Sequence, residues 1–259
     1  MTDAWNPDQY HRFREQRRAP FFDLLNLVQP GVGRVVDLGC GSGELTALLA
    51  ERTGATDTVG IDRSAAMLTE AQAHERPGLR FEEGDLAKWG DPADPVDLVF
   101  ANAALQWVPD HAAVLERWAG ALRPGGQLAV QVPANVDHPS HRLSAEVATE
   151  EPFRSALGGT PPPDPVLDVL APEQYAELLY CLGFVEQHVR LQVYGHVLAS
   201  TTEVVEWVKG TSLTRFQRLL SPALFDAFVD RYRNRLLDEL GSHTPYFYAF
   251  KRILFWARR

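Results

Sequence analysis

The chain has 259 residues, of which 45% are hydrophobic, so it is long and apolar enough to bury the core of one large domain. Its formal net charge of −9 argues against a broad nucleic-acid-binding face, which needs a basic surface. Its two cysteines give no disulfide framework, and we find no secretory, lipidation or membrane-spanning segment, so we expect a cytoplasmic protein with no membrane partner.

The first predicted element is an apolar strand that runs into a glycine-rich turn. Residues 35–43 read VVDLGCGSG, and a helical pattern follows over Glu44 to Arg52. Alternating glycines give the backbone freedom and leave room for a ligand against the main chain at the start of the helix. The turn therefore predicts a nucleoside site, although a tight turn without a ligand has a similar composition.

Three further apolar runs end in groups that suit a ligand. They are Thr58 to Ile61 ending in Asp62, Leu79 to Glu83 ending in Gly84 and Asp85, and Val96 to Ala101 ending in Asn102. Open α/β sheets bind ligands outside the carboxyl ends of their strands, so this repetition indicates one crevice. An acid at the position of Asp62, about twenty residues after the glycines, can accept both ribose hydroxyls.

Helical patterns alternate with these strands, over Ala65 to His74 and over His111 to Leu122. This alternation predicts a doubly wound, mostly parallel, Rossmann-like α/β sheet. A strand over Gln127 to Val132 follows, and the proline- and glycine-rich residues 133–165 after it are expected to form a long connection without a regular element.

The last third of the chain contains two strands with helices between them. The patterns predict a helix over Pro172 to Leu182, a strand over Phe184 to Leu191, helices over Thr202 to Lys209 and Pro222 to Leu240, and a final strand over Tyr246 to Arg258. Helices inserted between the last two strands would lie above the carboxyl edge of the sheet. We therefore expect a single domain, 1–259, with cap elements at approximately 1–30, 134–170 and 200–244.

The glycine turn departs from the usual phosphate-binding motifs. Glu44 stands where a dinucleotide fingerprint has its third small residue, and an acid there would repel a pyrophosphate. A P-loop is excluded because no Lys-Ser/Thr follows the glycines. These residues favour a nucleoside that carries no phosphate.

Four motifs, in order, resemble those of the class I S-adenosylmethionine-dependent methyltransferases. They are DLGCG at 37–41, Asp62, GDL at 84–86 and LRPGG at 122–126. The resemblance implies S-adenosyl-L-methionine as cofactor, with Asp62 at the ribose, Asp85 and the Leu86 amide at the adenine, and the other groups at the methionine end. The implied cofactor-binding residues are Asp37, Gly39, Cys40, Gly41, Asp62, Asp85, Leu86 and Asn102. Cys40 is interpreted as a small turn residue rather than a nucleophile.

Nearly the whole chain is similar to the trans-aconitate 2-methyltransferase family. The most specific piece is FANAALQWVPDH at 100–111, and others are WNP at 5–7, RRAP at 17–20, LAVQVP at 128–133 and ARR at 257–259. The resemblance implies methyl transfer to a carboxylate of a small tricarboxylate, an antiparallel last strand and a helical cap. One departure concerns Arg215, which is displaced by one position because Ser-Leu-Thr-Arg at 212–215 stands where the family usually shows Gly-Leu-Arg-Pro.

The implied reaction needs positively charged side chains to hold the substrate carboxylates, and it does not need a base to ionise them. A carboxylate with a pKa near about 4 is already ionised at neutral pH, so positioning and exclusion of water should supply most of the catalysis. Guanidinium forks hold carboxylates with a geometry that lysine does not reproduce. No certain catalytic residue is predicted. The expected positioning residues are Tyr10, Arg17, Arg18, Gln106, Trp107 and Arg215, and the expected substrate-binding residues are His11, Arg142, Tyr246 and Arg252. Surface charge is an alternative explanation for several of these arginines.

Other functions stay open at this point. The first alternative is a methyltransferase for another small carboxylic acid, and the second is a noncatalytic S-adenosylmethionine-binding protein. The negative net charge disfavours a nucleic-acid methyltransferase, and the departure of the glycine turn from the dinucleotide fingerprint disfavours an NAD oxidoreductase. His138 and His141 have no third ligand at a suitable spacing, so no metal is expected. The sequence leaves open the oligomeric state and which carboxylate is methylated.

Overall fold

The structure is a computed structural model that describes the backbone of residues 14–259 and the side chains from Arg18 onward. From Arg18 onward the chain divides into two compact units. Unit 2 comprises Arg18–Pro133, Asp168–Gln192 and Arg252–Arg259, and unit 1 comprises Ala134–Leu167 and Val193–Lys251. The cap elements expected near 134–170 and 200–244 fall mostly in unit 1, whereas residues 18–30 fall in unit 2.

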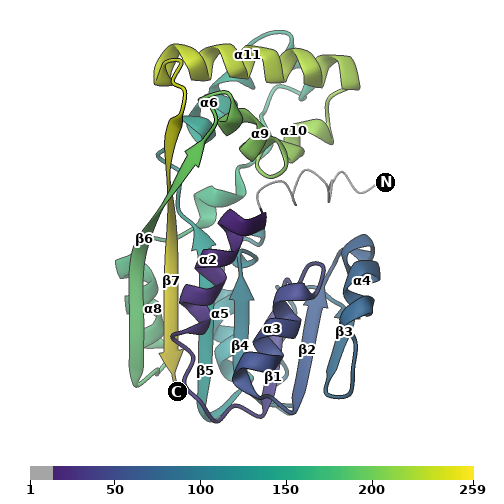
Figure 1. The fold of residues 1–259 in the computed structure, drawn as a ribbon, viewed down its shortest axis with the longest axis vertical. Coiled ribbons are helices and arrows are strands. Elements are labelled where there is room, and N and C mark those ends of the chain that lie inside the picture. Colours follow the sequence, from purple (N-terminus) through teal and green to yellow (C-terminus); the bar gives the residue numbers. More distant parts are fainter. Residues whose placement is uncertain (1–13) are drawn as a thin grey trace. The chain divides into compact units, whose positions relative to one another are not determined.

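A seven-stranded sheet has the order β3-β2-β1-β4-β5-β7-β6 (Figure 1). The strands are β1 (Arg34–Leu38), β2 (Asp57–Asp62), β3 (Leu79–Glu83), β4 (Val96–Asn102), β5 (Leu122–Pro133), β6 (Glu186–Leu198) and β7 (Tyr246–Arg258). Strands β1 to β5 pair in parallel, and β7 pairs antiparallel with β5. The predicted doubly wound, mostly parallel sheet with an antiparallel last strand is confirmed.

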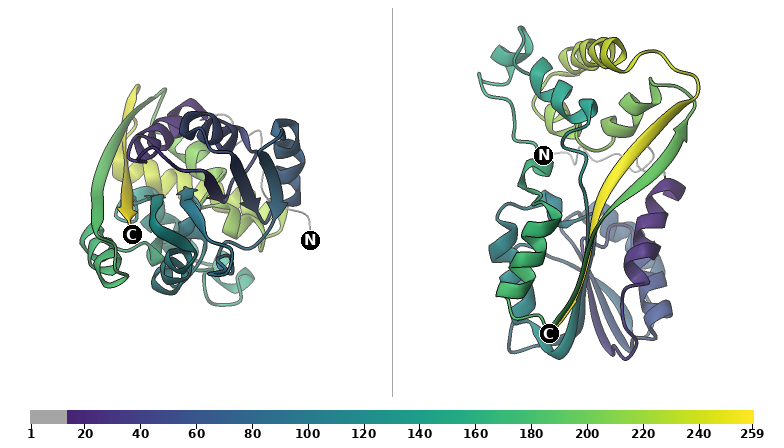
Figure 2. Two further views of the ribbon diagram at one scale, coloured as in Figure 1. Left: turned by 90° about the horizontal axis from the view of Figure 1, so that it is seen from below. Right: turned by 90° about the vertical axis from the view of Figure 1, so that its left-hand side faces the viewer.

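Helices cover both faces of the sheet in unit 2. They are α2 (Arg14–Leu25), α3 (Glu44–Thr53), α4 (Ala65–Ala71), α5 (His111–Gly120) and α8 (Pro172–Cys181), with 3-10 turns η1 (Gln72–His74) and η2 (Leu105–Trp107). Helices α2 and α3 lie on one face, and α5 and α8 lie on the other (Figures 1 and 2). Phe21 of α2 meets the Phe100 ring of β4 at a centroid distance of 5.5 Å, and Tyr175 of α8 stacks on Phe255 of β7 at 4.6 Å. Strands buried on both faces must be apolar throughout, which explains their continuous hydrophobic runs.

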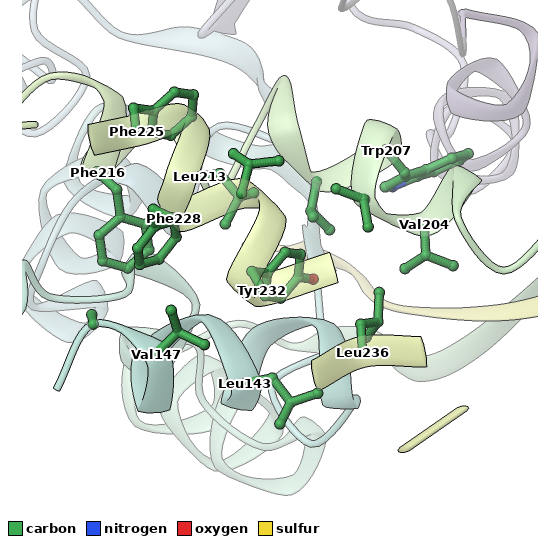
Figure 3. Packing of buried hydrophobic residues seen from close by; sticks show 14 of the residues in the cluster. Leu143, Val147, Val204, Trp207, Leu213, Phe216, Phe225, Phe228, Tyr232 and Leu236 are labelled. Atoms are coloured by element: carbon green, nitrogen blue, oxygen red, sulfur yellow. The ribbon is translucent and has the colours of Figure 1, made fainter. Parts of the chain in front are cut away.

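Unit 1 has its own hydrophobic core, built mainly by helices (Figure 3). These helices are α6 (Pro139–Val147), α7 (Phe153–Ala156), α9 (Glu203–Lys209), α10 (Thr214–Gln217) and α11 (Pro222–Leu240), and the 3-10 turn η3 (Pro165–Asp168) crosses the boundary between the units. The rings of Phe216 and Phe228 pack at 4.5 Å between centroids. The buried Tyr232 hydroxyl donates a hydrogen bond to the Ser140 carbonyl at 2.9 Å. Helices α9 to α11 form the predicted helical insertion between the last two strands.

The expectation that residues 133–165 hold no regular element is wrong, because α6 and α7 lie within this stretch. Pro139 occupies the first turn of α6, where a missing N–H costs nothing, and His138 Nδ1 accepts a hydrogen bond from the Ser140 amide at 3.1 Å. Leu143 and Val147 are four positions apart and both are buried in the unit 1 core. The glycine pair and the three prolines lie after α7. The composition of the end of the stretch therefore says nothing about its first half, where α6 forms.

In residues 14–259 no helix has both the length and the apolar character that crossing a membrane requires.

Candidate functional site

The turn between β1 and α3 depends on glycine for two reasons. Gly39, Gly41 and Gly43 have φ angles of 81°, 56° and 77°, which side chains disfavour. A Cβ on Gly39 would lie 2.3 Å from the Ala104 Cβ, and one on Gly43 would lie 2.7 Å from the Phe81 ring. The need for glycine at these positions therefore comes partly from close packing within the protein, which the sequence does not reveal.

Asp62 lies at the carboxyl end of β2 and holds the glycine turn in place. Its Oδ2 accepts a hydrogen bond from the Gly41 amide at 2.9 Å, and its Oδ1 accepts one from the Ser64 amide at 2.9 Å. The amides of Gly39 and Cys40 both donate to the Ile61 carbonyl, at 2.7 and 3.1 Å. Each carboxylate oxygen of Asp62 keeps further acceptor capacity, so two hydroxyl groups can still be bound.

Asp37, the acid that precedes the glycines, is only 4% exposed. Its Oδ2 accepts a hydrogen bond from the Thr46 hydroxyl at 2.6 Å. Burial raises the pKa of the Asp37 carboxyl to about 7; the Thr46 hydrogen bond opposes this shift and the Asp62 charge adds to it. A carboxyl with such a pKa changes its charge near neutral pH, and a bound cation would favour its ionised form.

Cys40 lies between the first two glycines of the turn, and its thiol is buried. Burial raises the pKa of this thiol, and the charges of Asp37 and Asp62 raise it further. The thiolate, which is the nucleophilic form, is therefore suppressed. The structure agrees with the interpretation of Cys40 as a turn residue.

Asp85 and Leu86 follow β3, the strand next to β2. Asp85 is exposed, its Oδ1 accepts a hydrogen bond from the Ala87 amide at 3.0 Å, and its Oδ2 is 3.6 Å from Lys88 Nζ. The Leu86 carbonyl accepts a hydrogen bond from Trp118 Nε1 at 3.0 Å. Because β2 and β3 are parallel neighbours, the acids that follow them lie at the same edge of the sheet.

The ends of β4 and β5 add a group of amide side chains to this edge. Gln106 Nε2 donates a hydrogen bond to the Ala103 carbonyl at 2.7 Å, and Ala103 has an unusual positive φ of 55°. Asn102 Oδ1, Gln106 Oε1 and Gln131 Nε2 are buried and have no hydrogen-bond partner within the described part of the chain. Buried polar atoms are normally paired, so this amide group suits a polar ligand. Trp107 is half-buried in η2 beside Gln106.

Arg252 of β7 is the predicted arginine that the fold brings to this amide group. It is 6% exposed, and its Nη1 donates a hydrogen bond to Gln131 Oε1 at 3.0 Å. Arg252 pairs in register with Pro133, at the carboxyl end of β5. Gln131 was missed by the sequence reasoning because it reads as an ordinary strand residue.

The other predicted substrate residues are placed differently. Arg18 of α2 belongs to unit 2, where its Nη1 is 3.8 Å from Glu44 Oε1. In unit 1, Arg142 is exposed and ion-paired with Glu146 and Glu239, Tyr246 is half-buried, and the Arg215 side chain is 10% exposed and ion-paired with Asp164. Tyr10, His11 and the side chain of Arg17 lie outside the described residues.

A family model described as a methyltransferase domain matches residues 35–126. A trans-aconitate 2-methyltransferase from Deinococcus radiodurans is 46% identical over 260 residues, covering 99% of this chain and 98% of the relative. Another, from Acidovorax ebreus, is 38% identical and covers 98% of each chain. The similarity to these relatives thus extends well beyond the residues that the family model matches.

Solved structures resemble the fold at low sequence identity. The YcgJ protein from Bacillus subtilis has a TM-score of 0.59 and 14% identity, covering 93% of this chain and 98% of that one. An S-adenosylmethionine dependent methyltransferase from Mesorhizobium loti has a TM-score of 0.51 and 23% identity, covering 94% and 100%. At these identities the likeness establishes the fold.

Proposed function

The chain belongs to the trans-aconitate 2-methyltransferase family, and from this premise we propose that it transfers a methyl group from S-adenosylmethionine to a carboxylate of trans-aconitate, giving a monomethyl ester. One observation carries the proposal on the structural side. At the carboxyl edge of the sheet, Asp62 accepts a hydrogen bond from the glycine turn and Asp37 accepts one from Thr46 of the helix that follows the turn, an arrangement that suits a nucleoside with a cationic end.

The residues of unit 2 match the parts of S-adenosylmethionine, which supplies an electrophilic methyl group on a sulfonium when it is bound. The Asp62 carboxylate would accept the ribose hydroxyls, and Asp85 with the Leu86 amide would bind the adenine. The main chain of residues 39–41 would lie along the methionine end, where Asp37 would offset positive charge. The unpartnered Asn102 Oδ1 gives this end a further acceptor.

No proton has to be removed from the acceptor, because a carboxylate is already ionised at neutral pH. The protein's task is to hold the acid, keep one carboxylate oxygen in line with the methyl group, and exclude water. Arg252 and the amides of Gln106 and Gln131 are proposed to contact the acid in unit 2. Arg18 and Trp107, and Tyr10, His11 and Arg17 before them, remain further candidates.

The direct test is to incubate the pure protein with S-adenosylmethionine and trans-aconitate and to look for the methyl ester by mass. A panel of other di- and tricarboxylic acids under the same conditions separates the proposal from a methyltransferase for another acid. Cofactor binding without any ester would instead indicate a noncatalytic binding protein.

We also propose that the protein works in the cytoplasm. Cys40 and Cys181 are both free thiols, and Cys181 is exposed, as a reducing compartment allows. Labelling of Cys181 by a membrane-permeable reagent in intact cells, but not by an impermeable one, is the expected result.

The raised pKa of Asp37 predicts that cofactor affinity depends on pH. Below about pH 7 the carboxyl of the free protein is protonated, whereas the cationic cofactor favours its ionised form. Binding should therefore release a proton, and the affinity should fall by up to about tenfold per unit as the pH drops below this value, with no change above it. Calorimetry in buffers of different ionisation enthalpy measures both effects.

Two variants check this assignment. Asp37→Asn should abolish the pH dependence. Thr46→Val removes the hydrogen bond that lowers the Asp37 pKa, so the fall in affinity should begin at a higher pH. A wild-type affinity that stays constant through neutral pH would contradict the role of Asp37.

Asp85→Ala should weaken cofactor binding by about 1 kcal/mol, since the adenine amino group loses an acceptor that is partly open to solvent. Asp91→Ala is a matched control, because Asp91 accepts a hydrogen bond from the amide two residues on, as Asp85 does, but lies outside the site. A cofactor analogue without the amino group should bind wild type and Asp85→Ala equally. If the wild-type protein also binds S-adenosylmethionine and this analogue with equal affinity, Asp85 does not bind the adenine amino group.

A further inference from the structure

Trp118 of α5 is a fully buried side chain that reaches the loop after β3. Its relative exposure is 0%, and its Nε1 donates a hydrogen bond to the Leu86 carbonyl at 3.0 Å, across 32 positions of the chain. Trp118 and this loop both belong to unit 2. The indole is therefore bonded to the residue that follows Asp85, the acid proposed for the adenine amino group.

The Leu86 carbonyl belongs to the peptide group that joins Leu86 to Ala87. The other end of the same peptide group, the Ala87 amide, donates a hydrogen bond to Asp85 Oδ1 at 3.0 Å. A peptide group is planar, so a contact that fixes its carbonyl also fixes the direction of its N–H. Two linked hydrogen bonds thus connect Trp118 Nε1 to the Asp85 carboxylate, and bonds linked in this way polarise one another.

The Asp85 carboxylate has little else to orient it. The Asp85 side chain is 45% exposed, and its Oδ2 lies 3.6 Å from Nζ of Lys88, whose side chain is 85% exposed. An ion pair this open to solvent does little to order either side chain. The hydrogen bond from the Ala87 amide to Oδ1 is therefore the contact that sets the direction of Oδ2.

Other residues of the loop lie close to α5 and to the glycine turn. A Cβ on Gly90 would lie 2.9 Å from the carbonyl oxygen of Arg117, the residue before Trp118. The Leu86 side chain reaches the glycine turn, since its Cδ2 lies 3.9 Å from the position of a Cβ on Gly39. The last turn of α5 therefore helps to determine where the residues after β3 stand relative to the turn.

We propose that Trp118 is a positioning residue for the adenine site. Through the peptide group between Leu86 and Ala87, it holds the Asp85 carboxylate in the direction in which Oδ2 accepts the amino group of the cofactor. The inference rests on the cofactor assignment in the proposed function, and it requires no contact between Trp118 and the cofactor.

Trp118→Phe tests the inference, because it removes the N–H donor and keeps an aromatic ring. The Kd for S-adenosylmethionine should rise about three- to fivefold, close to the loss expected for Asp85→Ala. Trp256→Phe is the matched control. Trp256 is 6% exposed in β7 of unit 2, and its Nε1 donates a hydrogen bond to Gln127 Oε1 at 2.8 Å. This variant loses a comparably buried indole hydrogen bond far from β3 in the sheet, and it should keep the wild-type Kd.

A double-mutant cycle separates positioning from a general structural effect. In the Asp85→Ala background, Trp118→Phe should raise the Kd by less than about twofold, because no carboxylate remains to be held. An analogue without the adenine amino group should bind Trp118→Phe and wild type with about the same affinity. If Trp118→Phe weakens binding by the same factor in both backgrounds, or for both cofactors, Trp118 has only a structural role and the inference is overturned.

Urea unfolding shows whether both Phe variants are folded at the temperature of the titration. If Trp118→Phe is not, nuclear magnetic resonance of the wild-type protein takes its place. The indole proton of Trp118 should shift when S-adenosylmethionine binds and should shift less with the analogue, because the amino group draws charge from the Asp85 carboxylate and so alters the linked hydrogen bonds. Equal shifts with the two cofactors would overturn the inference.

The failure of this inference can be told apart from that of the proposed function, because none of these titrations contains an acid substrate. A wild-type protein that binds S-adenosylmethionine but forms no methyl ester would reject the proposed reaction, and the cycle would still decide the role of Trp118. A wild-type protein that does not bind S-adenosylmethionine would overturn both.

Discussion

Asp62→Ala is expected to weaken S-adenosylmethionine binding by about 2 kcal/mol or more, which is roughly a 30-fold rise in Kd. The substitution removes the acceptors proposed for the ribose hydroxyls. It also frees the amides of Gly41 and Ser64, so the glycine turn loses its link to the end of β2. Calorimetric titration of the cofactor measures the change.

Asp57→Ala is the matched control for this variant. Asp57 begins the same strand that Asp62 ends, and it pairs with the half-buried Arg34 and the exposed Arg80 rather than with the turn. A cofactor analogue without one ribose hydroxyl should bind wild type more weakly than the normal cofactor, but should bind Asp62→Ala about as well. Unchanged affinity in Asp62→Ala would reject the role of this residue.

Gly39→Ala is expected to destabilise the protein by about 2–5 kcal/mol and to impair cofactor binding. A side chain at the φ of 81° is strained, which costs about 1–2 kcal/mol. The added Cβ would also lie 2.3 Å from the Ala104 Cβ, and overpacking of this kind costs about 1–3 kcal/mol. The free energy of unfolding in urea gives the stability change.

Gly54→Ala separates the two contributions. Gly54 also has a positive φ, 66°, but nothing lies within 4 Å of the position of its Cβ, so only the backbone strain remains. Ala104→Gly combined with Gly39→Ala should recover the part of the loss that comes from the overlap. If Gly39→Ala is no less stable than Gly54→Ala, the packing of the turn against Ala104 does not require glycine at position 39.

Much of unit 2 could be predicted from local sequence patterns. Apolar runs alternate with helical periodicity from Val35 to Val132, and β7 has the bounds predicted from its alternation. The acids and amides that follow the strands were placed at one edge because the carboxyl ends of parallel strands meet there. The cofactor residues assigned to this edge remain predictions about binding, but their grouping in unit 2 follows from topology.

Residues 133–165 differ from the structure that their composition predicts. Residues 133–165 were expected to form a connection because they are rich in proline and glycine, yet Pro139 begins α6 instead of preventing it. Proline breaks a helix only where its missing N–H or its ring interferes with the preceding turn, and the first turn has no such conflict. The position of a proline relative to the helix start decided the outcome.

The sequence by itself determined the order of elements, the parallel sheet and the places where glycines and acids stand, because these depend on the spacing of neighbouring residues. Only the tertiary structure decided which charged side chains are buried and which partners they have. It buries Arg215 against Asp164, brings Arg252 to Gln131 across 121 positions, and pairs Arg142 with Glu239 across 97. Such pairs depend on how distant segments pack. Burial decides whether a charge interacts strongly with a partner or is a solvated surface charge that contributes little free energy.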